Sequence, residues 1–268
     1  MTALGALLRA GDVVVLTGAG VSTDSGIPAY RDEEGQWKQS PPMQFRDFTG
    51  SQLSRQRYWA RSMVGWQRMA QASPNAAHHA LAEWERRGGV RLLITQNVDG
   101  LHSAAGSERV IDLHGRLDRV VCLGCRELSR RAELQARLVQ KNPEFLGQSF
   151  VVRADGDVEL SVDYERFELE ACAACGGVLK PDVVFFGENV PAPRVETAMA
   201  SLTGARALVI AGSSLMVFSG FRFARAASRL GVPVVVVNRG KTRADELAAL
   251  RVAGNVGEVL SETLRAAS

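Results

Sequence analysis

The sequence predicts an α/β protein built on a doubly wound parallel sheet. Short apolar runs rich in β-branched residues recur along the chain, as expected of strands buried on both faces. These runs lie within residues 12–26, 91–100, 205–214 and 232–240. Helix-like segments at 76–88 and 219–230 alternate with them, and each run ends in a polar loop.

The polar loops after the four runs contain the sequences TGAGVS, TQNVDG, AGSSLM and VNRG. Ligands of open parallel sheets bind outside the carboxyl ends of the strands, so we expect these loops to converge on one crevice. The GAG turn at 18–20 favours phosphate binding, because glycines let backbone N–H groups approach an anion. The signal is weak, since the dinucleotide motif has a third glycine where Thr23 stands. A tight turn without a ligand is the alternative.

Two regions interrupt this alternation of strands and helices. Residues 35–75 are rich in tryptophan, methionine and phenylalanine and resemble loop and helices. Residues 119–181 contain all four cysteines and an acidic stretch. We therefore expect a smaller domain made of 35–75 and 119–181, inserted into a larger sheet domain made of 1–34, 76–118 and 182–268.

The cysteines form two C-x-x-C pairs, Cys122 with Cys125 and Cys172 with Cys175. Four thiolates suit one tetrahedral zinc ion, and such a closed site leaves no coordination position for a reactive water. A long insert separates the pairs, which is tolerated because the two knuckles need only meet in space. A structural zinc ion is the favoured interpretation, with a redox pair or buried free thiols as the alternative.

Composition narrows the function classes. The chain has 268 residues, of which 46% are hydrophobic and 23% charged, with a net charge of +3. The charges are interspersed, so no nucleic-acid partner is expected. Apolar runs such as 232–237 are strand length, far short of the ~20 residues that span a bilayer, so no membrane partner is expected either. The N-terminus lacks a secretory pattern, and we expect a cytoplasmic protein. Without a coiled coil or repeat, a monomer is the default.

Two further segments are candidates for function. His114 follows an apolar run and precedes a glycine, a position suited to a general base near neutral pH, although a lone histidine is as often structural. His78 and His79 are typical of helix surface or packing, and His102 has a weaker case than His114. The segment KPDVVFFGE at 180–188 is either a core strand or an edge that pairs with an extended peptide.

Taken in order, these blocks resemble the sirtuins. The matching stretches are GAGVSTDSGIPAYRD (18–32), TQNVDGLH (95–102), HG (114–115), the two C-x-x-C pairs, KPDVVFFGE (180–188), GSSLMVFSG (212–220) and VNRG (237–240). The variety that the chain resembles is class II, the mitochondrial-type lipoamidase and ADP-ribosyltransferase sirtuins with their bacterial relatives. That likeness rests on RQRYWAR (55–61), on the long insert between the two cysteine pairs, and on the motifs DGDV and LKPDVVFFG. Tyr30-Arg31 departs from the Phe-Arg of many sirtuins.

The resemblance implies a Rossmann-like fold and an NAD-dependent protein-lysine deacylase, in other words a deacetylase-type enzyme. Asn97 would hold the nicotinamide ribose and a water, and Asp99 with Ile27 would contact the nicotinamide carboxamide. No protein nucleophile is required, because the acyl-lysine oxygen attacks the ribose as nicotinamide leaves. His114 would then take a proton from a ribose hydroxyl, and the acyl group would end on ADP-ribose. The family's zinc is structural.

Further residues are assigned by the same resemblance. NAD would contact Gly18, Ala19, Gly20, Ile27, Pro28, Tyr30, Arg31, Gln96, Asn97, Val98 and Asp99. Its adenosine side would contact Gly212, Ser213, Ser214, Asn238, Arg239, Gly240 and Val256. The acyl-lysine peptide would contact Val184, Phe185, Gly187, Glu188 and Met216.

Tyr58 and Arg61 bear on the acyl group. Their Tyr-x-x-Arg spacing is the one with which succinyl- and malonyl-selective sirtuins bind a carboxylate, and residues i and i+3 share a helix face. The alternative is helix packing for Tyr58 and a surface charge for Arg61. The rival functions are protein ADP-ribosylation on the same scaffold, a long-chain or acidic-chain deacylase similar to a lipoamidase, and a non-enzymatic NAD-binding module. A non-enzymatic module would be expected to have another residue at position 97 or 114, and both Asn97 and His114 are present.

Overall fold

The computed structural model describes residues 3–38, 42–147, 160 and 162–267. The chain divides into two compact units. The first unit comprises Met1–Lys38, Ser73–Leu113 and Val190–Ser268, and the second comprises Gln39–Ala72 and His114–Asn189. The DGDV stretch at 155–158 lies outside the described residues.

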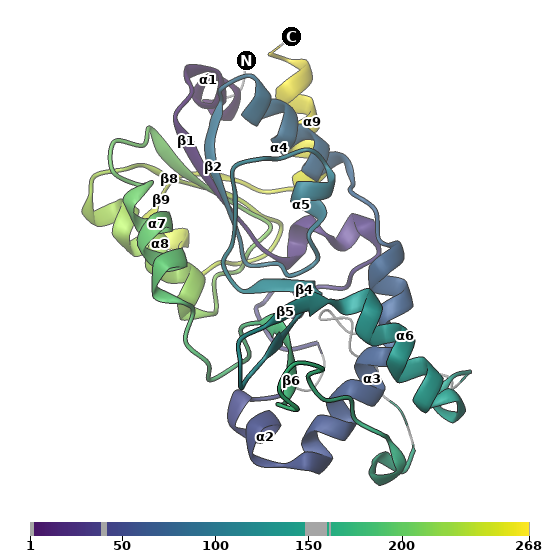
Figure 1. Ribbon diagram of the computed structural model, residues 1–268. Coiled ribbons are helices and arrows are strands. Elements are labelled where there is room, and N and C mark those ends of the chain that lie inside the picture. The colour runs from purple at the N-terminus through teal and green to yellow at the C-terminus, as the bar shows by residue number, and fades with distance from the viewer. Residues whose placement is uncertain (1–2, 39–41, 148–159, 161, 268) are drawn as a thin grey trace. The chain divides into compact units, whose positions relative to one another are not determined.

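The first unit contains a parallel sheet of six strands in the order β3-β2-β1-β7-β8-β9 (Figure 1). The strands are β1 (Val13–Thr17), β2 (Val90–Thr95), β3 (Val110–Asp112), β7 (Ala207–Ala211), β8 (Val234–Val237) and β9 (Ala248–Val252). Every residue of β1, β7 and β8 is buried. This confirms the predicted α/β fold with a buried parallel sheet.

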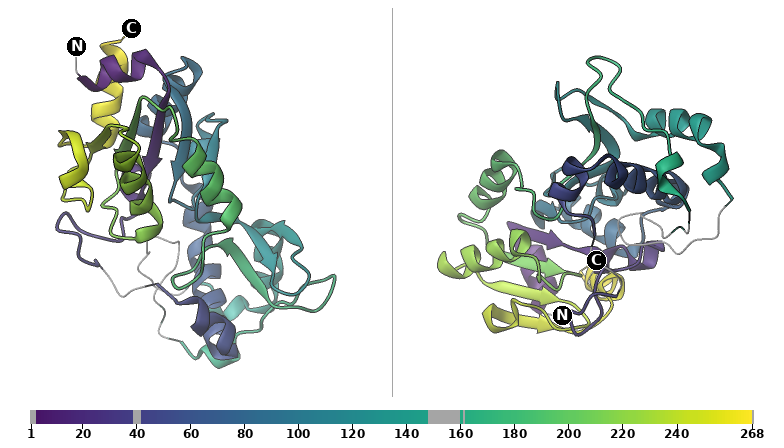
Figure 2. Two further views of the ribbon diagram at one scale, coloured as in Figure 1. Left: turned by 90° about the vertical axis from the view of Figure 1, so that its left-hand side faces the viewer. Right: turned by 90° about the horizontal axis from the view of Figure 1, so that it is seen from below.

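Helices cover both faces of this sheet, because alternate residues of a strand point to opposite sides. Val13 and Val15 of β1 pack in one core with α1 (Ala3–Ala10), α4 (Ala76–Arg86) and α9 (Val256–Arg265). Val14 and Leu16 pack in a second core with α7 (Ala192–Ala200) and α8 (Phe218–Arg229). α1 lies beside α9, so the first and last helices of the described chain are neighbours (Figure 2). The sheet is therefore doubly wound, as predicted.

Short helices complete the first unit. These are α5 (Leu101–Ala104) and the 3-10 turns η1 (Ala19–Val21), η2 (Thr23–Ser25) and η5 (Asp245–Leu247). The glycine turn after β1 thus leads into single 3-10 turns, whereas a phosphate-binding turn typically opens an α-helix.

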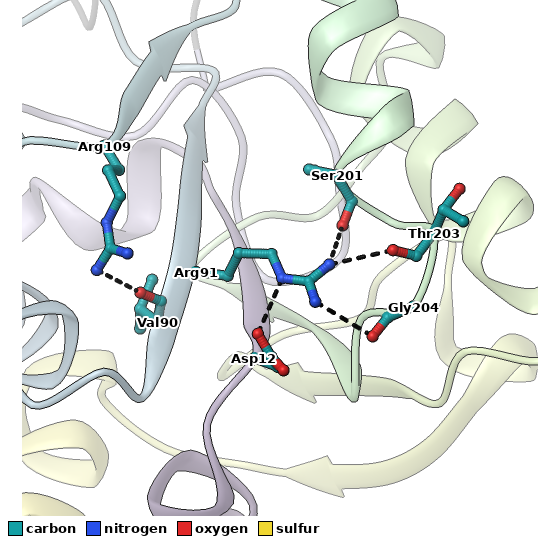
Figure 3. A network of polar contacts seen from close by, with 7 residues as sticks. All are labelled: Asp12, Val90, Arg91, Arg109, Ser201, Thr203 and Gly204. Carbon is teal, nitrogen blue, oxygen red and sulfur yellow. Dashed lines mark hydrogen bonds and ion pairs between the residues drawn. The ribbon is translucent and has the colours of Figure 1, made fainter.

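Arg91, on β2, links segments at the amino-terminal ends of the parallel strands (Figure 3). Its guanidinium donates to the backbone oxygens of the turn after α7, at 3.2 Å for Ser201, 3.1 Å for Thr203 and 3.3 Å for Gly204. Its Nε also lies 3.1 Å from a carboxylate oxygen of Asp12. One planar side chain therefore joins β2 to the turn between α7 and β7 and to the residue before β1.

The second unit has a three-stranded antiparallel sheet in the order β5-β4-β6. Its strands are β4 (Gly115–Cys122), β5 (Leu128–Arg130) and β6 (Leu179–Val183). Its helices are α2 (Phe45–Gly50), α3 (Gln52–Gln71), α6 (Arg131–Lys141), η3 (Pro143–Phe145) and η4 (Tyr164–Arg166). One hydrophobic core joins α3, α6 and the sheet.

The unit boundaries differ from the expected domain boundaries. Residues 114–118 and 182–189 belong to the second unit, whereas the sequence placed them in the sheet domain. The reason is strand pairing, since Gly115 in β4 pairs with Val183 in β6. Residues 35–38 belong to the first unit, where Lys38 donates to the carbonyl of Tyr30 at 2.9 Å. Among the described residues, no helix is long and apolar enough to cross a membrane.

Candidate active site and metal centre

In the first unit, the loops after β1 and β7 are fastened together. The amide of Gly20 donates to the carbonyl of Gly212 at 2.8 Å, and the amide of Gly18 donates to that of Ala211 at 3.2 Å. A Cβ atom on Gly18 would lie 2.7 Å from the Cβ of Ser213, so no larger residue fits there without a shift. The GAG motif therefore permits close contact between two strand-end loops.

Gln96 connects the loop after β2 to the same place. Its side-chain amide donates to the Ser213 hydroxyl at 2.7 Å, and its backbone amide donates to the Thr17 carbonyl at 3.0 Å. A Cβ atom on Gly220, in α8, would lie 2.3 Å from the Gln96 side-chain oxygen. The structure thus brings three of the predicted loops together at the carboxyl ends of β1, β2 and β7.

A polar cluster forms between the loops after β1 and β2. The Asn97 side-chain amide donates to the Gly18 carbonyl at 3.1 Å and to the Ser22 hydroxyl at 3.0 Å. The Ser22 hydroxyl donates to a carboxylate oxygen of Asp99 at 2.7 Å. The other Asp99 oxygen accepts from the Leu101 amide at 2.9 Å, at the start of α5. The strand-end cluster (Ser22, Asn97 and Asp99) is therefore held in place by hydrogen bonds within the protein.

Ser22 is a member that the sequence interpretation did not select, although it lies within the predicted TGAGVS loop. The available signal was its position two residues after Gly20, in the first turn beyond β1. Its hydroxyl donates to a carboxylate and not to an imidazole, so it does not form the Ser–His pair of a common serine nucleophile. This agrees with chemistry in which the protein supplies no nucleophile.

Beneath this cluster lies a buried layer of histidine and threonine. His102 Nε2 lies 2.9 Å from the Thr17 hydroxyl, which donates to the Thr95 hydroxyl at 2.9 Å. Thr95 in turn accepts from the Asn97 amide at 3.1 Å. His102 is 2% exposed, and through the two threonines its hydrogen bonds connect to the loop that follows β2.

His78, in α4, lies against His102 with ring centroids 4.7 Å apart and is fully buried. Its Nδ1 accepts from the Asn75 amide at 3.2 Å, which completes a capping box at the start of α4. Burial is the main cause that lowers the pKa of His78 to about 4, against the opposing charge of Asp99. Burial also lowers the pKa of His102 well below its usual value. Both imidazoles are therefore neutral at pH 7 and structural, and His79 is an exposed residue of α4.

The remaining predicted NAD residues also belong to the first unit. Tyr30 and Arg31 open a hairpin in which the Arg31 guanidinium stacks 3.9 Å from the Trp37 ring centroid. The hairpin reaches the loop after β8, where the Lys241 amide donates to the Glu33 carbonyl at 2.9 Å. Ile27 and Val256 are buried, each 6% exposed. Half-buried or exposed positions are taken by Ala19, Pro28, Val98, Ser214, Asn238, Arg239 and Gly240. Met216, which was predicted to contact the substrate, is half-buried.

The second unit holds a cluster of four cysteines. The Sγ atoms of Cys122, Cys125, Cys172 and Cys175 all lie within 4.8 Å of one another. Cys122 and Cys175 are 3.5 Å apart and Cys125 and Cys172 are 3.7 Å apart, far longer than a disulfide. Tetrahedral zinc with Zn–S bonds of about 2.3 Å requires sulfur separations of about 3.8 Å, so the cluster fits the ion.

Backbone amides favour the thiolate form of one of the four cysteines, Cys122. Hydrogen bonding from the amide of Cys125, and further from that of Gly124 at 3.3 Å, lowers the pKa of the Cys122 thiol to about 6, although burial opposes this. A Cβ atom on Gly177 would lie 2.8 Å from the Cys122 sulfur, so the residue two positions after Cys175 needs to be a glycine for the sulfur atoms to come together. Four cysteines occupy all positions of a tetrahedral ion, and the site is structural.

His114 is the first residue of the second segment of the second unit, 114–189, and is half-buried. Its carbonyl accepts from the Val184 amide at 2.8 Å, which fixes the backbone of the predicted base beside the predicted substrate segment. Gly115 follows with φ of +82°, and a Cβ there would lie 2.0 Å from the Asp182 carbonyl. The HG motif therefore needs its glycine for backbone geometry.

Tyr58 and Arg61 both lie on α3 and are buried, 9% and 4% exposed. Tyr58 packs against Phe185 with ring centroids 5.2 Å apart, so it lies next to a residue that was predicted to contact the acyl-lysine peptide. Arg61 is not the surface charge that the alternative interpretation supposed. Phe185 itself lies within the core of the second unit.

Comparisons with known proteins agree on one family. The Sir2 family profile matches residues 18–219. The chain is 56% identical over 248 residues to an NAD-dependent protein deacetylase of Xanthomonas campestris pv. campestris, covering 92% of this chain and 85% of that protein. It is 53% identical over 251 residues to an NAD-dependent protein deacetylase of Bordetella bronchiseptica, covering 93% and 92%.

Solved structures give the same result. A Sir2 structure with a p53 peptide and NAD⁺ superposes with a TM-score of 0.75 at 30% identity, covering 97% of this chain and 95% of that chain. A structure described under the mechanism and regulation of Sir2 enzymes gives a TM-score of 0.73 at 31% identity, covering 97% and 94%. With a family profile matched over most of its length and relatives above 50% identity, this chain belongs to the Sir2 family.

Proposed function

We propose that this protein is an NAD-dependent protein-lysine deacylase that transfers an acyl group from lysine to ADP-ribose and releases nicotinamide. The observation that carries the proposal is the strand-end cluster of Ser22, Asn97 and Asp99, fixed at the carboxyl ends of β1 and β2. It offers amide and carboxylate groups in the place where parallel sheets bind nucleotides. The deacetylase names of the relatives support the same activity.

Within this proposal each residue has a defined role. Asn97 orients the nicotinamide ribose, and Asp99 accepts a hydrogen bond from the nicotinamide carboxamide. His114 accepts a proton from a ribose hydroxyl during acyl transfer. NAD, when bound, supplies the ADP-ribose that receives the acyl group. Zinc holds the second unit together and takes no part in the reaction, because a four-cysteine site leaves no open position.

The substrate class is an acyl-lysine peptide. Solved Sir2 structures that contain a p53 peptide support this class. We propose that the segment 184–188 contacts the peptide, and that NAD occupies the residues assigned to it above. Class II membership, carried by the RQRYWAR stretch on α3, is part of the proposal.

The test is product analysis with purified protein, NAD and peptides that carry acetyl, glutaryl or lipoyl lysine. Equal amounts of nicotinamide, free lysine and acyl-ADP-ribose are expected. ADP-ribosylated protein without acyl-ADP-ribose would instead assign the rival transferase activity. Because Tyr58 lies beside Phe185 and Arg61 is buried three residues further along α3, we expect longer or acidic acyl groups to react better than acetyl. A clear acetyl preference would refute this specificity.

A further inference from the structure

Lys180, in β6, is an unusual lysine because its side chain is buried. It is 3% exposed, although lysine is rarely buried without a partner. Its ammonium donates to the carbonyl of Val183 and lies 3.1 Å from a carboxylate oxygen of Glu188. It also lies 4.8 Å from the ring centroid of Phe185. All three contacts go to the segment that follows Lys180 in the chain.

Glu188 completes the same arrangement from the other end of the segment. The carboxylate oxygen that pairs with Lys180 also accepts from the Phe185 amide at 2.9 Å. The Glu188 amide donates to the Phe185 carbonyl at 3.0 Å, which closes a tight turn with Gly187 at φ of +80°. The carboxylate is thus occupied within the protein, whereas the sequence assigned Glu188 to the substrate.

Backbone contacts hold the segment at its start and at its middle. The carbonyl of Phe186 accepts from the Phe45 amide at 2.8 Å, and Gln44 pairs with Phe186 in an isolated bridge. Val184 is held through the carbonyl of His114. The Lys180–Glu188 ion pair adds a side-chain link that spans this segment from one end to the other, and its lysine is buried while its glutamate is about one quarter exposed.

We infer that Lys180 is a positioning residue for the acyl-lysine peptide, and that the Lys180–Glu188 pair holds residues 183–188 in the shape that contacts the substrate. The inference rests on the proposed function, which places the peptide on this segment. A misplaced binding segment weakens peptide binding, whereas the NAD-binding loops belong to the first unit and keep their geometry. The pair should therefore affect the peptide KM and leave the NAD KM unchanged.

The experiment is steady-state kinetics on the zinc-loaded protein with an acyl-lysine peptide and NAD varied separately. Lys180→Met removes the charge at similar length, and we expect the peptide KM to rise about tenfold with an NAD KM close to wild type. Lys180→Arg restores a donor and should recover most of the loss. Glu188→Gln keeps an acceptor for the Phe185 amide but loses the ion pair, so it should also raise the peptide KM.

Lys141→Met is the matched control, because Lys141 forms a 2.6 Å ion pair with Glu170 in the same unit and should leave kinetics unchanged. The double variant Lys180→Met/Glu188→Gln should be no worse than the poorer single variant. A folded Lys180→Met protein with unchanged peptide KM would overturn the inference alone. If it does not fold, Glu188→Gln decides by the same criterion. Wild-type protein that releases no nicotinamide overturns the proposed function and this inference with it.

Discussion

Acidification should destabilise the first unit through His78. Its pKa is about 4 in the folded protein against 6.5 for the free side chain, mainly because it is buried. Below pH 6.5 the unfolded chain therefore binds a proton that the folded chain excludes, and stability falls as the pH falls toward 4. The difference amounts to about 2 kcal/mol at pH 5 and about 3 kcal/mol below pH 4. This loss is absent above pH 7.

The assay is hydrogen exchange of the amides of β1 and β2, which reports the opening free energy of the first unit, measured from pH 7.5 to pH 5. The matched variant is His78→Gln, because glutamine at this position can still accept from the Asn75 amide and complete the capping box, yet it does not titrate. Wild type should lose about 2 kcal/mol more than the variant over this range. Equal losses in both proteins would refute the assignment of this pH dependence to His78.

Three further predictions follow from single sites. Cys172→Ser, or a strong chelator, should release one zinc ion and unfold the second unit. Metal analysis and circular dichroism would show both effects. Full zinc content with unchanged melting would contradict the four-cysteine site. Arg91→Ala should cost about 2 kcal/mol in urea unfolding, since three backbone oxygens lose their donor, and Arg91→Lys should recover only part of it. His114→Ala should lower the deacylation rate at least ~100-fold, while NAD affinity stays near that of the wild type. Product assays would measure the rate and calorimetry the affinity. Normal turnover would show that His114 is not the general base.

The sequence predicted the central strands well and the peripheral elements poorly. β1, β7 and β8 are uniformly buried, so their apolar β-branched composition is a direct consequence of position. β3 has only three residues and β9 alternates half-buried and exposed positions, so neither produces an apolar run. The N-terminal, central and C-terminal helices α1, α7 and α9 were not predicted from their short amphipathic patterns.

Local chemistry accounts for the parts of the site that sequence could predict. Thiol pairs at C-x-x-C spacing form a metal site wherever the knuckles meet, so the four cysteines were assigned correctly as a cluster. Parallel strands place their following loops at one edge, so the convergence of the loops around Gly18, Gln96 and Ser213 was also predictable. Both inferences depend on spacing and strand direction, which sequence reports.

Tertiary structure alone decided the partners of each polar side chain. Ser22 joins Asn97 to Asp99 across more than 70 positions of the chain, and no local pattern encodes that contact. Likewise, the pairing of the Glu188 carboxylate with buried Lys180 could not be read from the sequence. Composition and periodicity determine which segments become strands and which residues can bind metal. Hydrogen-bond partners depend on distances between loops that are remote in sequence, and these distances are set only when the chain has packed.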